Sequence, residues 1–213
     1  ILLYKFFNWD IPKFVHLPLL LNQDKSKLSK RQGDVAVEDY LNKGFLPEAI
    51  INFVALLGWH PKNEQEILCL EELEKVFSLN RINKSSAVFD VKKLNWMNGQ
   101  YLKNLPLDTI IIYAKPFFID EGFNISNSQK FNDAIENVRK RVNTILEMID
   151  YIAPFYNKLS FSNEELNVLK DDSSQAVLKY FSKKLSNKMN CSEEEIKSLI
   201  KETGENTNIN GKE

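Results

Sequence analysis

Apolar residues recur at three- and four-residue intervals along much of this chain, which is the spacing of one face of an α-helix. Around residues 46–58, Pro47 suits the first turn of a helix and Gly58 suits its end. The apolar face predicted there comprises Leu46, Ile50, Phe53, Val54 and Leu57. A further stripe comprises Leu70, Leu73, Val76 and Phe77. The pattern therefore predicts a mainly α fold.

Residues 135–152 have the most regular pattern, with apolar positions separated alternately by three and four residues. This spacing predicts one long amphipathic helix over the whole range. The apolar positions are Ile135, Val138, Val142, Ile145, Ile149 and Ile152.

Two Ser-x-x-Glu patterns predict helix starts further along, because the serine and glutamate side chains can each accept a backbone N–H of the first turn. They are Ser162 with Glu165 and Ser192 with Glu195. Another helix is predicted between them from the stripe Val177, Tyr180, Phe181 and Leu185.

Strand structure is predicted only for residues 14–21, while residues 109–113 are too short to separate strand from helix. Pro106 disfavours helix at the residue before it, so residues 105–108 are predicted to be a junction between modules.

Composition limits the kinds of partner and site that the chain is expected to have. The 28 Lys plus Arg and 29 Asp plus Glu residues give a net charge of −1, so any RNA contact must depend on local cationic clusters. Cys69 and Cys191 lack metal-ligand spacing, His16 and His60 lack a partner at a diagnostic distance, and no metal site is predicted. No apolar run is long enough to span a bilayer, so no membrane contact and a cytoplasmic location are expected.

Residues 27–31, with the sequence Lys-Leu-Ser-Lys-Arg, are the strongest candidates for chemistry. They follow an apolar run and a polar turn, which places cationic side chains on a loop. Lysine as a point charge and arginine as a planar fork can neutralise charge on a phosphoryl group during its transfer. Taken alone, a short cationic loop of this kind is more often a solvated turn.

The pentapeptide resembles the Lys-Met-Ser-Lys-Ser signature of class I aminoacyl-tRNA synthetases, in the form common in bacterial glutamyl-tRNA synthetases. Residues 12–40 and 44–59 resemble the same family, and residues 79–102 resemble the start of its anticodon-binding region. Arg31, where the generic signature has serine, is normal for the glutamyl branch. Three blocks in the family's order are more specific than one pentapeptide.

The resemblance implies an enzyme that activates glutamate with ATP and Mg²⁺ and then transfers it to tRNA(Glu). Lys30 matches the family's second signature lysine, and its implied catalytic role is to contact ATP and stabilise the transferring phosphate. The implied ATP-binding loop comprises Lys27, Leu28, Ser29, Lys30 and Arg31. Lys27 and Arg31 are expected to shape the loop and assist, and Ser29 to hold its geometry.

The family's His-Ile-Gly-His-type motif is not found in this sequence. The resemblance therefore implies a C-terminal-side piece, without the N-terminal nucleotide-binding half and the distal end, inactive alone and monomeric. The predicted modules are 1–105, the end of the catalytic region with a stem-contact helical domain; 106–203, an α-helical anticodon-binding domain; and 204–213, a polar tail.

A mixture of cations and an aromatic residue favours tRNA contact by residues 81–98, since cations hold phosphate and rings offer a stacking face. The candidates are Arg81, Lys84, Lys92, Lys93, Trp96 and Asn98. Arg141 and Thr144 match an Arg-x-x-Thr pattern that in the family presents an arginine near the third anticodon base. An ordinary helix with solvated lysines and a core tryptophan is the alternative.

Three other functions fit parts of the sequence. A non-catalytic tRNA-binding module would share the cationic surface, and a helical interaction scaffold would share the periodicity. A glutaminyl-tRNA synthetase piece would share the signature, but its anticodon end is built from β-barrels, and the helical pattern after residue 125 disfavours it.

Overall fold

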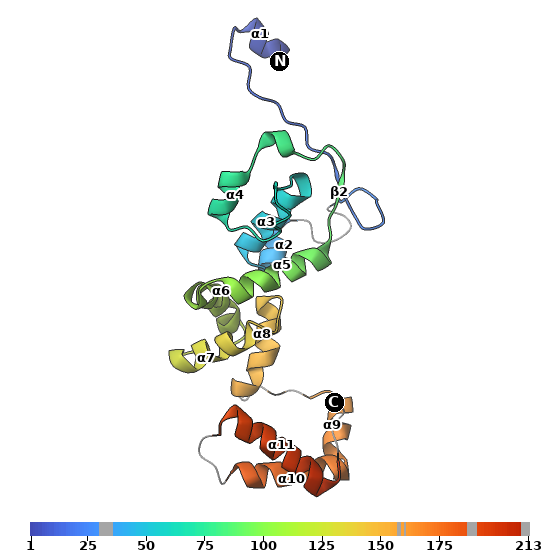
Figure 1. The fold of residues 1–213 in the computed structure, drawn as a ribbon, viewed down its shortest axis with the longest axis vertical. Coiled ribbons are helices and arrows are strands. Elements are labelled where there is room, and N and C mark those ends of the chain that lie inside the picture. Colours follow the sequence, from blue (N-terminus) through green and yellow to red (C-terminus); the bar gives the residue numbers. More distant parts are fainter. Residues whose placement is uncertain (30–35, 157–158, 160, 187–190, 210–213) are drawn as a thin grey trace. The chain divides into compact units, whose positions relative to one another are not determined.

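The computed structural model describes residues 1–29, 36–156, 159, 161–186 and 191–209. The chain divides into two compact units, residues 1–158 and 159–213. Most described residues are helical, which confirms the predicted mainly α fold (Figure 1).

The first unit contains eight α-helices, two short strands and two 3-10 turns among its described residues. In chain order they are α1 (Leu2–Phe6), β1 (Leu20–Leu21), α2 (Val37–Asn42), α3 (Pro47–Gly58), α4 (Leu70–Val76), η1 (Leu79–Arg81), β2 (Ala87–Val88), α5 (Val91–Asn104), α6 (Leu107–Asp120), α7 (Ser128–Val138), α8 (Ile145–Ile152) and η2 (Ala153–Tyr156).

Helix α3 begins at Pro47 and ends at Gly58, as predicted. Four of its five predicted core residues are buried, but Val54 is 50% exposed, because it lies at the edge of the apolar face. In α4 and the residue after it, Leu73 alone of the predicted stripe is buried, whereas the other three are 43–47% exposed. The apolar spacing therefore located both helices, but fewer of the apolar positions are buried than it predicted.

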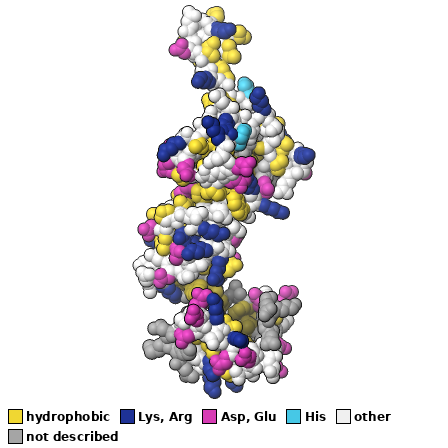
Figure 2. Space-filling view, viewed as in Figure 1, with side chains coloured by type: hydrophobic (Ala, Val, Ile, Leu, Met, Phe, Trp, Pro, Cys, Tyr) yellow, Lys and Arg dark blue, Asp and Glu magenta, His cyan; other side chains and the backbone are white. Residues whose placement is uncertain are grey.

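The predicted strand at residues 14–21 is wrong except for its last two residues. β1 pairs in parallel with β2, with Leu20 opposite Ala87 and Leu21 opposite Val88. Residues 14–19 form no strand, and the apolar side chains of residues 1–19 are largely exposed (Figure 2). Residues 109–113 lie inside α6, where Ile110, Ala114 and Phe118 are buried at helical spacing.

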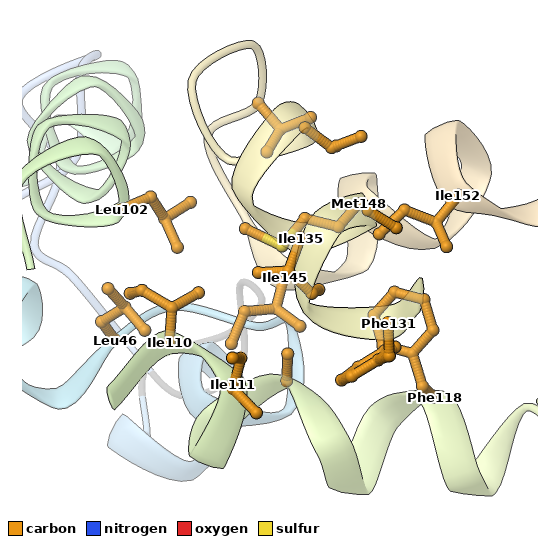
Figure 3. Close-up of a cluster of buried hydrophobic side chains, with 14 of the residues drawn as sticks. Leu46, Leu102, Ile110, Ile111, Phe118, Phe131, Ile135, Ile145, Met148 and Ile152 are labelled. Carbon is orange, nitrogen blue, oxygen red and sulfur yellow. The ribbon is translucent and has the colours of Figure 1, made fainter. Parts of the chain in front are cut away.

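One apolar cluster joins the start of α3, the end of α5, and α6, α7 and α8 (Figure 3). Leu46 and Leu102 contribute to it together with Ile110 and Phe118. Other residues of α3 and α5 pack in a second cluster, which contains Phe53. Because α5 contributes to both clusters, the compact unit continues past residue 105. The predicted boundary between modules at residue 105 stays a prediction.

The prediction of one helix over residues 135–152 is wrong. The chain leaves α7 at Val138 and starts α8 at Ile145. Thr144 is the N-cap of α8, and its hydroxyl accepts the backbone N–H of Glu147 at 3.2 Å. Val142 lies in the intervening turn and is 2% exposed, so apolar spacing continues across the break because both helices and the turn face one core.

The second unit contains α9 (Asn163–Lys170), α10 (Asp172–Leu185) and α11 (Glu193–Thr207). Both predicted capping boxes are confirmed, at Ser162 and at Ser192. Glu202 of α11 accepts hydrogen bonds from the Tyr180 hydroxyl at 3.0 Å and from Lys184 Nζ at 2.7 Å, both on α10. Helix α11 continues into residues 204–207, within the predicted polar tail.

Among the described residues, no helix has the length and apolar character needed to cross a bilayer.

Candidate functional site

Residues 20–28, which include the first two residues of the signature, form a small hairpin. Leu28 N donates to Leu20 O at 3.0 Å, and Asn22 N donates to Ser26 O at 2.8 Å. At the tip, Asp24 accepts hydrogen bonds from both the side chain and the backbone of Ser26, and these bonds lower the pKa of the Asp24 carboxyl group. The chain therefore reaches the signature from a hydrogen-bonded turn.

This hairpin is attached to the N-terminal end of α5. Phe89 N donates to Leu21 O at 2.8 Å, which continues the β1–β2 pairing. Gln23 Nε2 lies 3.4 Å from Asp90 Oδ1, and Asp90 caps α5 by accepting the backbone N–H of Lys92 at 2.9 Å. The hairpin and the first turn of α5 thus form one local structure.

Within the signature, Lys27 is exposed, and Leu28 and Ser29 are half-buried. Lys30 and Arg31 lie outside the described residues. The predicted roles of all five residues stay predictions.

Two of the cations predicted to contact RNA are engaged within the protein. Arg81 Nη2 donates to Pro61 O at 2.7 Å and the residue is half-buried, while Lys93 Nζ pairs with Glu66 at 2.5 Å. Lys84 and Lys92 are exposed.

One exposed face of α5 carries cations around an aromatic ring. Lys92 and Trp96 are four residues apart and therefore neighbours on the helix, and Trp96 is 44% exposed. Lys103 is also exposed, and it lies eleven residues after Lys92, close to three full helical turns. We call Lys92, Trp96 and Lys103 the α5 stripe. Lys103 is not among the residues that the sequence predicted to contact tRNA, although it lies at helical spacing from Lys92.

The prediction that Asn98 contacts tRNA is wrong, because this residue is completely buried. Its Oδ1 accepts the backbone N–H of Leu46 at 2.7 Å, and its Nδ2 donates to the backbone oxygen of Asn143 at 2.5 Å. Both ends of the amide are therefore used inside the protein.

Residues 139–144, which we call the anchored turn, connect α7 to α8. Arg139 Nη1 donates to Leu105 O at 2.6 Å, and Arg139 Nε lies 2.7 Å from a Glu136 carboxylate oxygen. Hydrogen bonding from Lys140, with a smaller effect of Arg139, lowers the pKa of Glu136. Arg139 therefore links the start of the anchored turn to the C-terminal end of α5.

Arg141 is exposed in the middle of the anchored turn. Its guanidinium makes no hydrogen bond or ion pair with another described residue, unlike those of Arg81 and Arg139. Lys84, Arg141 and the residues of the α5 stripe are thus exposed groups that can meet an external partner.

The described part of the chain brings no three His, Cys, Asp or Glu side chains together as a metal site. Cys69 and Cys191 are free thiols, and His60 Nδ1 lies 2.9 Å from Asn83 Oδ1.

Two family models match the chain in succession. Residues 1–96 match one described as tRNA synthetases class I (E and Q), catalytic domain, and residues 109–213 match an anticodon binding domain.

Curated relatives match over almost the whole chain. The glutamate–tRNA ligase of Carboxydothermus hydrogenoformans is 39% identical over 100% of this chain and 45% of its own length. That of Prosthecochloris aestuarii is 44% identical over 94% of this chain and 42% of its own length. The chain thus spans a little under half of these relatives.

A crystal structure of a glutamate tRNA ligase from Elizabethkingia meningosepticum, in complex with its amino acid, has a similar fold. The TM-score is 0.76 at 28% identity, covering 98% of this chain and 45% of that one. The described part of residues 107–207 is helical, which departs from the β-barrels expected of a glutaminyl-tRNA synthetase.

Proposed function

Since this chain belongs to the glutamate–tRNA ligase family over the length that it spans, we propose that it works as part of an enzyme that charges tRNA(Glu). Such an enzyme joins glutamate to ATP, forming glutamyl adenylate and pyrophosphate, and transfers the glutamyl group to the terminal adenosine of the tRNA. The observation that carries the proposal is similarity at about 40% identity along the whole chain, including the signature block.

In this proposal the hairpin of residues 20–28 supports the ATP-contacting signature. Lys30 follows the described residues directly, and its ammonium group supplies positive charge to the phosphate that glutamate attacks. Lys27 and Arg31 add to the local positive charge, and Mg²⁺ enters with the nucleotide. Because glutamate and most of ATP are held elsewhere in such an enzyme, this chain contributes one side of the reaction.

The tRNA is proposed to lie along the α5 stripe and the anchored turn. Lys92 and Lys103 would hold phosphates while the half-exposed Trp96 ring offers a stacking surface. Arg141 would reach a base of the anticodon. Cations that are already paired within the fold, such as Lys93, contribute less.

Arg141→Ala is expected to reduce discrimination among tRNAs that differ at the third anticodon position by about tenfold, because base contacts specify whereas phosphate contacts only position. Lys183→Ala is the matched control, since Lys183 is an exposed cation of α10. It should lower affinity evenly for all the tRNAs, or not at all. Discrimination is measured by equilibrium binding of each variant to the tRNA series. Wild-type discrimination in Arg141→Ala would show that Arg141 is an ordinary solvated surface residue without a base contact.

A non-catalytic tRNA-binding module is the second candidate, favoured by the share of its relatives that this chain spans. The 213-residue chain alone is expected to bind tRNA but to show no glutamate-dependent pyrophosphate exchange, with or without tRNA. Exchange above background from the pure chain would contradict the proposed division of labour. Loss of tRNA binding as well would contradict both candidates.

A further inference from the structure

Three segments meet at the side chain of Asn98. This residue lies in the middle of α5 and is completely buried, so its amide has access to protein groups only. It accepts the N–H of Leu46 at the start of α3 and donates to the backbone oxygen of Asn143 in the anchored turn. A single amide therefore fixes the anchored turn against two helices.

A second attachment lies at the end of the anchored turn. Ile145 N donates to Gly44 O at 3.0 Å. The backbones approach so closely that a Cβ on Gly44 would lie 2.8 Å from Leu146 N. The last residues of the turn are therefore held by backbone contacts as well.

Arg139 attaches the beginning of the same turn. It donates to Leu105 O at 2.6 Å and to Leu102 O at 3.4 Å, which are carbonyl groups at the C-terminal end of α5. A guanidinium suits this position because its several N–H groups can serve neighbouring carbonyls and its charge complements the negative end of the helix. Both ends of the turn are thus fastened to α5.

Arg141 lies between these attachments and is exposed. A side chain on a backbone held at both ends loses less conformational entropy on binding than one on a free loop, and its reach is set in advance.

We propose that Asn98 and Arg139 are positioning residues for anticodon discrimination, which set the place of Arg141 without touching RNA themselves. This inference rests on the proposed function, in which Arg141 contacts an anticodon base. It predicts that loosening either attachment impairs discrimination as loss of Arg141 does.

The test is binding of the 213-residue chain to tRNAs varied at the third anticodon position, at a temperature where unfolding curves show each variant to be folded. Asn98→Ala should lower discrimination several-fold, up to the roughly tenfold loss expected for Arg141→Ala. The double variant should discriminate no worse than Arg141→Ala alone, because both substitutions remove the same interaction. Arg139→Gln, which loosens the other end of the turn, should act in the same way and carries the test if Asn98→Ala does not fold.

Gly99→Ala is the matched control. The added methyl group would meet Asn143 Oδ1 at 2.4 Å, which is the end of an exposed side chain that can rotate away. The hydrogen bond from Asn98 to the Asn143 backbone oxygen would stay in place, so discrimination should equal that of wild type.

The outcomes separate the two proposals. If Arg141→Ala lowers discrimination while folded Asn98→Ala and Arg139→Gln retain it, the positioning role is overturned and the base contact stands. Additive losses in the double variant would overturn it as well. If Arg141→Ala leaves discrimination unchanged, the base contact fails, and the positioning role fails with it.

Discussion

Replacing Lys30 by alanine in a full-length ligase that contains this chain is expected to slow glutamyl adenylate formation about 100- to 1000-fold, the effect of losing one preorganised donor to a transition state. The reason is that negative charge is redistributed over the phosphate while pyrophosphate departs, and a fixed ammonium group stabilises that charge without reorganisation. Glutamate-dependent pyrophosphate exchange, measured with tRNA present, reports this step.

The tRNA affinity of the Lys30→Ala enzyme should change little, since the proposed RNA contacts lie on α5 and the anchored turn. Lys25→Ala is the matched control, because Lys25 is an exposed lysine of the same hairpin outside the signature. Near-normal exchange in Lys30→Ala would show that the signature is structural. An equal loss in Lys25→Ala would assign the effect to the charge of the loop as a whole.

Gly44→Ala is expected to lower the free energy of unfolding of the first unit by about 2–4 kcal/mol. Gly44 follows the end of α2 with φ +79°, a left-handed conformation that costs a residue with a Cβ about 1–2 kcal/mol. The new methyl group would also lie within 3.0 Å of backbone atoms of Ile145 and Leu146, and such overpacking costs about 1–3 kcal/mol. Denaturant unfolding followed by fluorescence reports on the first unit, because Trp9, Trp59 and Trp96 all belong to it.

Gly58→Ala provides the comparison for this substitution. Gly58 lies in the last turn of α3, where a Cβ would meet only Leu17 Cδ2, at an ordinary 3.7 Å. Alanine there should leave stability unchanged or raise it by up to about 1 kcal/mol through helix propensity. A wild-type unfolding midpoint for Gly44→Ala would mean that α2 and the start of α8 do not meet as closely as described.

The sequence was sufficient to predict a helix start where the residues that mark it lie in the first turn of that helix. The capping boxes at Ser162 and Ser192 began helices as predicted, because a hydroxyl and a carboxylate satisfy N–H groups of their own first turn. Pro47 likewise placed the start of α3. The signature block, read by resemblance, pointed to the family that the comparisons support.

At residues 135–152, two local patterns in the sequence predict different structures: the apolar spacing predicts one helix, and a capping pattern predicts a new helix start. Thr144 and Glu147 form the same kind of capping pattern, and Thr144 does cap α8. The apolar period continues through it, since α7, the anchored turn and α8 cover one core, so periodicity alone could not reveal the break.

The sequence by itself determined the helical class of this protein and the starts of the helices at Pro47, after Ser162 and after Ser192, while the chemistry of its signature stays a prediction. Only the tertiary structure showed that Asn98 is buried and hydrogen-bonded to two other segments, and that Arg139 donates to the C-terminal end of α5. It also showed that Arg141 is exposed. The physical reason is distance along the chain: Asn98 lies 52 residues from Leu46 and 45 from Asn143. No local pattern encodes such a pairing, because the packing of distant segments determines the partners of a buried polar group.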